Sequence, residues 1–243
     1  MKKRILLLLA AVMSIALTSC NDDDWSSDSY WVDMGTVQKV SPTSHEFYIL
    51  LDNGDKVWPA ITNLPYYNPK DGQRIIASYT ILSNRHDGYN HDVRLNDIYQ
   101  VLTKPIVKLT TANADSIGND PLVITDAWIS SDHLNIEFEF LGDSKLHMVN
   151  LVESDQFPST PEVAKLQFRQ NGYGDNQRYR MRGIVSFSIS SLQTAGAQNR
   201  KIELTTTSYD GSTKTLQLTY DWPGIVKIED SINYNTKDYS AVN

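Results

Sequence analysis

Residues 133–140 read His-Leu-Asn-Ile-Glu-Phe-Glu-Phe, and this segment indicates the fold class most clearly. Apolar and polar side chains alternate along it from Leu134 onward. Because successive side chains of a β-strand point to opposite faces, this period of two predicts a strand with one buried face and one wet face. Residues 178–190 repeat the alternation, with arginine and serine side chains on the wet face. No window of helical length past residue 30 carries a clean apolar stripe, so we expect an all-β mature protein.

Earlier residues form a first group of strands. We expect these strands at 31–40, 46–51, 56–61, 74–82 and 98–109. The sequence Asp-Asn-Gly-Asp at 52–55 is typical of a tight hairpin, because Asn-Gly tolerates the positive φ angles of such turns. Five strands in roughly 80 residues suit a small closed barrel, which we assign to residues 30–110.

Later strands form a second group, which we assign to a β-sandwich over residues 111–230. Residues 202–204 and 216–222 form a pair joined through 209–213, and residues 146–152, apolar on both faces, suggest a central strand. A helical turn is expected only at 160–165, where Thr160 can cap and Pro161 suits the first helical position. The polar stretch 109–118 marks the expected division between the domains, and residues 231–243 form a polar tail.

The N-terminus has the layout of a signal peptide. Three basic residues at 2–4 precede an apolar run at 5–17, which would span only about 20 Å as a helix, short of a bilayer core of roughly 30 Å. We therefore expect no transmembrane helix in the mature chain. The tetrapeptide Leu-Thr-Ser-Cys at 17–20 resembles a bacterial lipobox, in which Cys20 becomes the first mature residue and carries lipid. The alternative is an ordinary secretory signal over residues 1–19 that leaves Cys20 as a free thiol.

An acidic segment follows the cysteine directly. Asn21, Asp22, Asp23 and Asp24 resemble the surface-export signal of lipoproteins from the Bacteroidota. Three like charges also suit a plain solvated tether over residues 20–29. Two or more acyl chains would hold the protein stably on a membrane. We expect a lipid anchor in the outer membrane with the protein on the cell surface, and the alternative is a protein that faces the periplasm.

The composition excludes several classes of protein. A single cysteine among 243 residues rules out a disulfide framework, a cysteine-rich zinc site and an iron–sulfur cluster. Without residues 1–19, the chain has 19 basic residues against 29 acidic ones, a net charge of −10. This charge disfavours a nucleic-acid partner, because binding to the phosphate backbone needs a basic face. No cofactor is indicated.

With these residues in view, the chain resembles a NigD-like lipoprotein of the Bacteroidota over essentially its full length. The segments that carry the resemblance are 17–24, 71–74, 126–136, 146–152 and 183–189. The resemblance implies an OB-type five-stranded barrel followed by an immunoglobulin-like β-sandwich, in a family whose members are named at most as candidate immunity lipoproteins. An OB barrel usually carries a helix between its third and fourth strands, whereas residues 63–72 hold two prolines and a glycine, which favour a loop.

Nothing in the sequence predicts an enzyme, and we assign no catalytic residue. No nucleophile stands on a sharp turn of the G-x-S-x-G kind. Glu137 and Glu139 share one strand face, where we expect ordinary solvent access and cross-strand ion pairs. Their expected partners are Arg178, Arg180 and Arg182, and the alternative is that these arginines form a row that recognises anions.

Histidines suggest a metal only weakly. Residues 86–92 hold two histidines and two aspartates, but their spacing matches no metal-ligand signature and suits a plain turn, so we predict no metal site. The other histidines, His45, His133 and His147, are expected at loop or strand surfaces.

A binding surface has better support, because OB barrels bind ligands with one strand face and two loops. In this chain that surface would contain Trp58, Tyr66, Tyr67, His86, Tyr89, His91 and Arg94. Tyrosine and tryptophan give large amphipathic contact area at small entropy cost, which suits a protein partner or stacked sugars. The alternative is that Trp58 and Tyr79 pack inward while Tyr66 and Tyr67 cover the barrel end. We expect a non-enzymatic, lipid-anchored envelope protein that recognises another protein, with bacteriocin immunity or glycan binding as alternatives.

Overall fold

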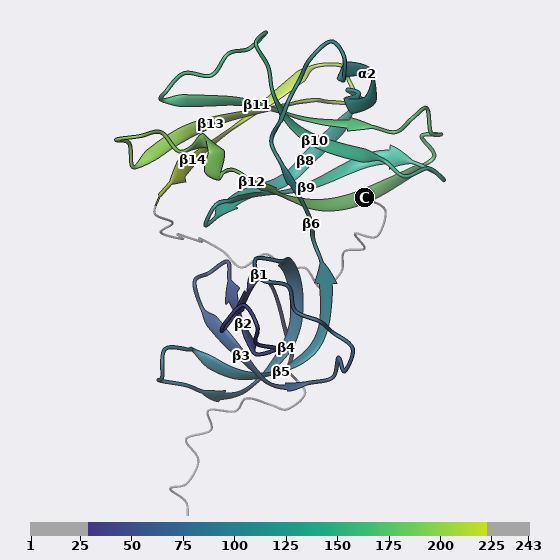
Figure 1. Ribbon diagram of the computed structural model, residues 1–243. Coiled ribbons are helices and arrows are strands. Elements are labelled where there is room, and N and C mark those ends of the chain that lie inside the picture. Colours follow the sequence, from purple (N-terminus) through teal and green to yellow (C-terminus); the bar gives the residue numbers. More distant parts are fainter. Residues whose placement is uncertain (1–28, 223–243) are drawn as a thin grey trace, which may run out of the picture.

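The computed structural model describes residues 29–222, which fold into two β-domains joined by one short connection (Figure 1). Strands dominate both domains, so the expected all-β class is confirmed. Among residues 29–222 no helix is long and apolar enough to cross a membrane. The predictions for the signal peptide, for Cys20 and for residues 21–24 and 231–243 lie outside the described residues.

The N-terminal domain is a closed five-stranded barrel. Its strands are β1 (Trp31–Lys39), β2 (Phe47–Leu51), β3 (Lys56–Thr62), β4 (Arg74–Asn84) and β5 (His91–Gln100). They close in the order β1-β2-β3-β5-β4, with β3 parallel to β5, which confirms the expected OB-type barrel. Only one side of each strand faces the interior, so alternate residues form the core. These core residues are Val37, Ile49, Leu51, Val57, Ile75, Ala77, Tyr79, Ile81, Val93 and Leu95.

Two connections in the barrel form as the sequence predicts. Gly54, in the hairpin between β2 and β3, has a φ of +94°, which glycine adopts without the strain that a side chain would add. The connection between β3 and β4 contains turns and no helix over residues 63–73. Its prolines explain this, because proline removes a backbone donor and disrupts a helix interior.

The division between the domains lies earlier in the chain than expected. After β5, the next strands are β6 (Leu102–Pro105) and β7 (Val107–Lys108), and both belong to the sandwich. The division therefore falls near residue 101 and not at 109–118, and the strand expected at 98–109 is broken. β6 pairs with one sheet of the sandwich and β7 with the other. The connection is thus held by backbone hydrogen bonds to both sheets.

The C-terminal domain is a sandwich of two sheets, as expected. Their strand orders are β14-β13-β11-β10-β7 and β6-β12-β9-β8. The remaining strands are β8 (Leu122–Ser130), β9 (His133–Gly142), β10 (Met148–Glu153), β11 (Val163–Asn171), β12 (Tyr179–Ser188), β13 (Asn199–Thr207) and β14 (Thr213–Asp221). Residues 133–140 lie in β9. The apolar side chains of this segment are at most 1% exposed: Leu134, Ile136, Phe138 and Phe140.

Helical structure in the sandwich differs from the prediction. The turn expected at 160–165 does not form, although Thr160 Oγ1 accepts the N–H of Val163 at 3.1 Å as a helix cap would. Strand β11 begins at Val163 instead, because the alternating pattern that follows favours a strand. Two short helices lie elsewhere, α2 (Ala114–Ile117) and η1 (Ser190–Leu192).

The barrel packs against the outer face of β9, β12 and β8. Met34, Ile76 and Val101 form a buried apolar cluster with Ile184 on β12, and Trp128 on β8 packs against it. Beside this cluster lies a set of polar side chains that we call the interdomain network. Its members are Thr36, Asp52, Arg74, Trp128 and Asn135.

The face of β9 that the sequence predicts to be solvent-exposed is therefore partly buried. Asn135 is 0% and Glu137 is 2% exposed, so the expected solvent access of Glu137 is wrong. This part of the sheet faces the barrel, and the polar residues there serve the interface. Farther along β9, Glu139 pairs with Arg180 and Arg182 at 3.0 Å each, which confirms the expected cross-strand ion pairs for these two arginines, whereas Arg178 lies 3.7 Å from Asp143 instead.

Candidate functional site

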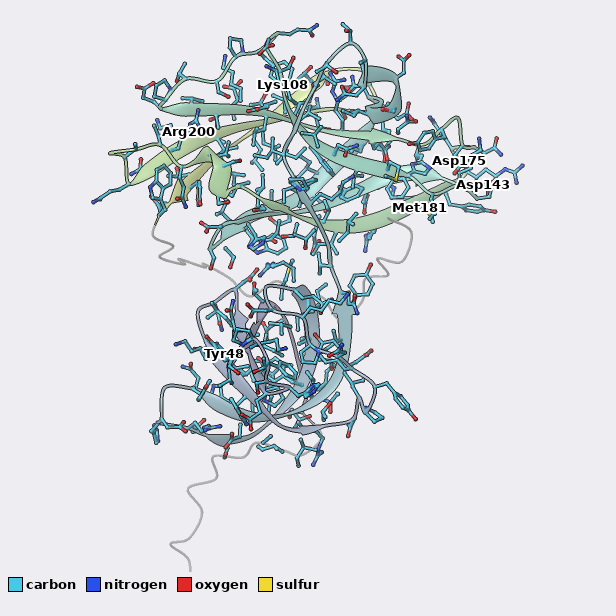
Figure 2. All side chains as sticks on the ribbon, in the orientation of Figure 1. Tyr48, Lys108, Asp143, Asp175, Met181 and Arg200 are labelled. Carbon is cyan, nitrogen blue, oxygen red and sulfur yellow. The ribbon has the colours of Figure 1, made fainter. Side chains whose placement is uncertain are left out.

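Four side chains on the outside of the barrel form what we call the aromatic–arginine cluster: Tyr48, Trp58, Arg85 and Tyr89. Tyr48 and Trp58 stand next to the buried Ile49 and Val57, so strand alternation turns both of them outward. Arg85 and Tyr89 come from the loop between β4 and β5. Figure 2 labels Tyr48 on the flank of the barrel. Strands 2 and 3 and this loop are the parts that OB barrels use to bind ligands.

The three rings of the cluster pack edge to face. The centroid of the Tyr89 ring lies 5.0 Å from that of Trp58 and 5.3 Å from that of Tyr48, with interplanar angles of 62° and 69°. The guanidinium of Arg85 lies 5.2 Å from the Trp58 ring centroid and 4.8 Å from the Tyr89 centroid. Both distances fall within the range of a cation–π contact. The four side chains therefore hold one another in a single arrangement.

The charge of Arg85 is shared with two carboxylates. Its Nε donates to Asp87 at 2.6 Å, its Nη2 also binds Asp87, and its Nη1 donates to Asp92 at 3.0 Å. Hydrogen bonding to Arg85 lowers the pKa of Asp87, and the same bond raises the pKa of Arg85. The cluster therefore offers ring surface beside a fixed, largely neutralised cation.

Backbone hydrogen bonds fix the loop that carries Tyr89. The Asn90 N–H donates to the carbonyl of Lys56 at 2.8 Å, and the Lys56 N–H donates to Asn90 Oδ1 at 2.8 Å. The Arg85 N–H donates to the carbonyl of Asn90 at 2.9 Å. Because Lys56 begins β3, these bonds place the loop beside the strand that holds Trp58.

The structure brings two of the seven predicted binding residues together, Trp58 and Tyr89. His86 is exposed in the same loop. His91 begins β5, where its Nδ1 lies 2.9 Å from Asn84 Oδ1. Arg94 is half-buried farther along β5. The sequence analysis missed Tyr48 and Arg85, and the only signal for Tyr48 was its alternation with the buried residues of β2.

The two other predicted tyrosines stand outside the cluster. Tyr66 is 97% exposed on the connection between β3 and β4. Tyr67 packs edge-on against Phe47 at 5.7 Å and donates to Gln73 Oε1 at 3.1 Å, and burial raises its pKa to about 12. Tyr67 therefore packs onto the barrel, which agrees for this residue with the alternative that Tyr66 and Tyr67 cover the barrel end. Tyr79 also packs inward, at 3% exposure, whereas Trp58 does not.

The predicted histidine–aspartate stretch at 86–92 shows no metal-binding geometry. Its two carboxylates, Asp87 and Asp92, both pair with Arg85. Within the described part of the chain, no group of three or more His, Cys, Asp or Glu side chains is placed to hold a metal ion.

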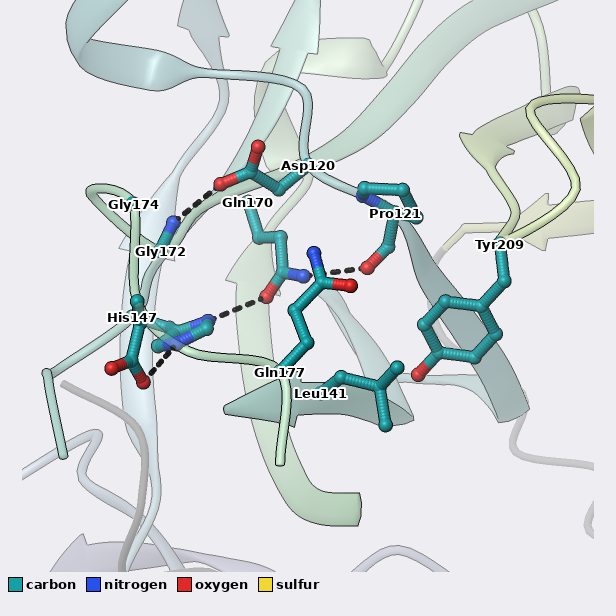
Figure 3. Close-up of a pocket in the computed structure, with 10 residues that line it drawn as sticks. Asp120, Pro121, Leu141, His147, Gln170, Gly172, Gly174, Gln177 and Tyr209 are labelled. Carbon is teal, nitrogen blue, oxygen red and sulfur yellow. Dashed lines mark hydrogen bonds and ion pairs between the residues drawn. The ribbon is translucent and has the colours of Figure 1, made fainter. Parts of the chain in front are cut away.

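A second polar arrangement lies in the sandwich (Figure 3). His147 is 2% exposed, so the expected surface position is wrong. Its Nδ1 lies 3.2 Å from Gln170 Oε1 and its Nε2 lies 3.2 Å from Asp175 Oδ2. Gln170 Nε2 in turn donates to the carbonyl of Pro121 at 2.7 Å. Both ring nitrogens of His147 are therefore engaged by neighbouring side chains, which fixes the orientation of the ring.

Two family models match the chain. Residues 34–101 match the NigD-like N-terminal OB domain, and residues 105–220 match the NigD-like C-terminal beta sandwich domain. The matches divide where the barrel ends in the structure. No curated protein is similar enough to the chain to match it.

Several solved structures are similar to the chain. A protein of unknown function from Bacteroides vulgatus is 32% identical, with 88% of this chain and 100% of that chain covered and a TM-score of 0.72. A candidate toxin-related protein from Parabacteroides distasonis is 33% identical, with 80% and 95% covered and a TM-score of 0.70. A NigD-like immunity protein from Bacteroides caccae shares the fold at 18% identity, with 81% and 98% covered and a TM-score of 0.61.

Proposed function

Because the chain belongs to the NigD-like family, we propose that it is a lipid-anchored protein of the cell envelope that binds another protein and catalyses no reaction. In this proposal Cys20 carries the lipid in the outer membrane, and residues 21–24 direct the protein to the cell surface. The single observation that carries the binding function is the aromatic–arginine cluster.

The cluster has the chemistry of a protein-binding surface. Tryptophan, tyrosine and arginine dominate the few residues that supply most of the free energy at protein interfaces. Here these side chains already hold one another, with ring centroids 5.0 and 5.3 Å apart. Side chains ordered before binding lose less conformational entropy in the complex. The arrangement therefore supports recognition without a large rearrangement of the barrel.

Site-specific cross-linking in intact cells tests this function. A photoreactive amino acid replaces Lys56, which lies beside the cluster with its Nζ 6.0 Å from the Tyr48 ring centroid. We expect one discrete cross-linked protein from this position and none from Lys70, an exposed control position on the same domain. Adding Trp58→Ala removes the product, whereas adding Tyr66→Ala leaves it. Equal products from positions 56 and 70 would contradict the proposal.

A second candidate is protection against a protein toxin, since a solved protein of the same fold is named an immunity protein. In that case the partner of the cluster is the toxin itself. Deleting the gene then sensitises cells to the toxin, and a copy with Trp58→Ala fails to restore resistance. Unchanged sensitivity after deletion would remove this candidate and leave the binding function standing.

A further inference from the structure

A small cavity lies at one edge of the sandwich, apart from the aromatic–arginine cluster. Its volume is about 70 Å³, and it lies where the loop from β9 to β10, the loop from β11 to β12 and the hairpin from β13 to β14 come together. Figure 3 shows the ring of Tyr209 on one side and Gln177 and Leu141 beside it. Asp120 and Pro121 line another side. The cavity therefore combines an aromatic wall with side chains that can bind hydroxyl groups.

The buried floor of the cavity is rigid. His147 and Gln170 are 2% and 1% exposed and bind each other, and His147 also binds Asp175, as described above. Asp120 Oδ2 accepts the N–H of Gly172 at 2.8 Å. An ionised carboxylate is an acceptor only, so the exposed Asp120 keeps further acceptor capacity for hydroxyl donors. An anionic group would be repelled there.

An arginine pair flanks the same cavity. Arg180 lies opposite Leu141 in the register of β12 and β9, and Leu141 lines the cavity. The Tyr209 hydroxyl donates to the carbonyl of Glu139 at 3.2 Å, and the Glu139 carboxylate binds both Arg180 and Arg182. Tyr209 therefore lines the cavity and also contacts the residue whose carboxylate binds the two guanidinium groups.

The two arginines keep most of their binding capacity. Each uses one N–H on Glu139 at 3.0 Å, and a guanidinium has five N–H donors. Their side chains are 68% and 50% exposed, whereas that of Glu139 is 12% exposed. One carboxylate between two cations leaves this trio with one unmatched positive charge, beside a cavity lined by the carboxylates of Asp120 and Asp175. Planar guanidinium groups match the geometry of carboxylate and sulfate.

We propose that this edge of the sandwich is a binding site for an acidic polysaccharide. Hydroxyl groups of one sugar enter the cavity toward Asp120 and Gln177, the ring lies against Tyr209, and a sulfate or carboxylate group binds Arg180 and Arg182. A glycan supplies donors and an anionic group close together, as the site requires. An acidic peptide such as poly-aspartate supplies anionic groups without hydroxyl donors for Asp120, and an anionic phospholipid surface offers no sugar ring to lie against Tyr209. This site is independent of the proposed protein-binding cluster.

Calorimetric titration of the mature full-length chain with chondroitin sulfate and with polygalacturonate tests the proposal. We expect saturable binding of at least one of them and none of neutral dextran. The double variant Arg180→Gln/Arg182→Gln weakens binding about tenfold or more, because charge-assisted bonds to the anionic group are lost. Lys165→Gln/Lys201→Gln, on the opposite sheet, removes the same charge and changes the affinity less than about twofold.

A second variant keeps the test valid if the double variant unfolds. Tyr209→Ala removes the ring on an exposed hairpin, and we expect about a fivefold loss of affinity or more, whereas Tyr209→Phe keeps the ring and most of the binding. Three results would overturn the proposal: no binding of either acidic polysaccharide, equal weakening by the lysine control pair, or equally tight binding of poly-aspartate or of phosphatidylglycerol vesicles.

Discussion

Arg74 on the barrel donates a hydrogen bond from Nη2 to Asn135 Oδ1 on the sandwich at 3.0 Å. The same guanidinium binds both carboxylate oxygens of Asp52, at 2.6 and 2.7 Å, and Thr36 Oγ1 at 3.0 Å. On the sandwich side, Trp128 Nε1 donates to Asp52 Oδ2 at 2.9 Å and Ser186 Oγ donates to Asn135 Oδ1 at 2.8 Å. The charge pair lies within the barrel, and its hydrogen bonds to Asn135 and Trp128 of the sandwich help to fix the relative position of the two domains.

Replacing Arg74 tests the strength of this network. Arg74 is 1% exposed, so Arg74→Met leaves Asp52 as a buried charge without its cation. We expect the free energy of unfolding to fall by about 3–5 kcal/mol, measured by urea denaturation. The double variant Arg74→Met/Asp52→Leu should lose less than the sum of the single variants, because the two residues interact directly. A loss below about 1 kcal/mol in Arg74→Met would contradict the role given to the network.

Trp128 contributes the hydrogen bond that reaches Asp52 from the sandwich. Trp128→Phe keeps an aromatic ring and removes the Nε1 donor, so we expect a loss of about 1.5–3 kcal/mol, the range for hydrogen bonds to charged groups. Trp222→Phe is the matched control, since the Trp222 ring packs against Tyr220 with centroids 5.1 Å apart. Thermal unfolding of both variants measures how much stability each of them loses. Equal stability of the two would show that the Trp128 hydrogen bond contributes nothing.

Gly172 lies against the buried imidazole of His147. A Cβ added at Gly172 would come within 2.6 Å of His147 Cε1, closer than atoms can pack. Gly172→Ala should therefore destabilise the sandwich by about 1–3 kcal/mol, the usual effect of overpacking a core. Denaturant titration followed by tryptophan fluorescence measures this. A variant as stable as the parent would mean that the His147 side chain can move aside.

Acid should weaken the sandwich through Asp175. Burial raises the pKa of this carboxyl group, but N–H bonds from Asp143 and Ser144 and the contact with His147 outweigh burial and hold the pKa well below its usual 3.8. A pKa depressed in the folded state stabilises the fold fully above about pH 4, and this contribution is lost as the pH falls through the unfolded-state pKa toward the folded one.

The variant Asp175→Asn removes this dependence. Stability curves of the parent and of Asp175→Asn should differ most near neutral pH and converge as the pH falls below about 4. Asp155, paired with Lys108 and with an 86% exposed side chain, provides the control variant Asp155→Asn, whose curve should follow the parent. A constant gap between the Asp175→Asn and parent curves at every pH would contradict this assignment.

The sequence predicted the strands better than it predicted what covers them. Alternation at 133–140 identifies β9 and its buried face, but the burial of Asn135 and Glu137 depends on a second domain, which no period along one strand reveals. Likewise, β6 and β7 are too short for a periodic signal, and both pair with strands distant in sequence. The division between the domains was therefore misplaced.

The candidate site was predicted in part for a similar reason. Trp58 and Tyr89 were chosen as aromatic residues on a strand and loop that OB barrels use for binding. Tyr48 and Arg85 are 37 positions apart, and only closure of the barrel brings Tyr48 beside the loop that carries both Arg85 and Tyr89. The length and polarity of Arg85 gave no sign that it would lie over two rings. The segments 71–74 and 126–136, which carry part of the family resemblance, include Arg74, Trp128 and Asn135. In the structure these three residues belong to the interdomain network.

The proposed function requires that Cys20 attach the protein to the membrane through a lipid. Intact mass spectrometry of the protein extracted from its native membrane measures this directly. We predict a polypeptide that begins at Cys20 and carries the added mass of two or more acyl chains, and a Cys20→Ser variant that lacks this mass and leaves the membrane fraction. A native polypeptide that begins at another residue, or that carries no acyl mass, would contradict the proposed lipid anchor.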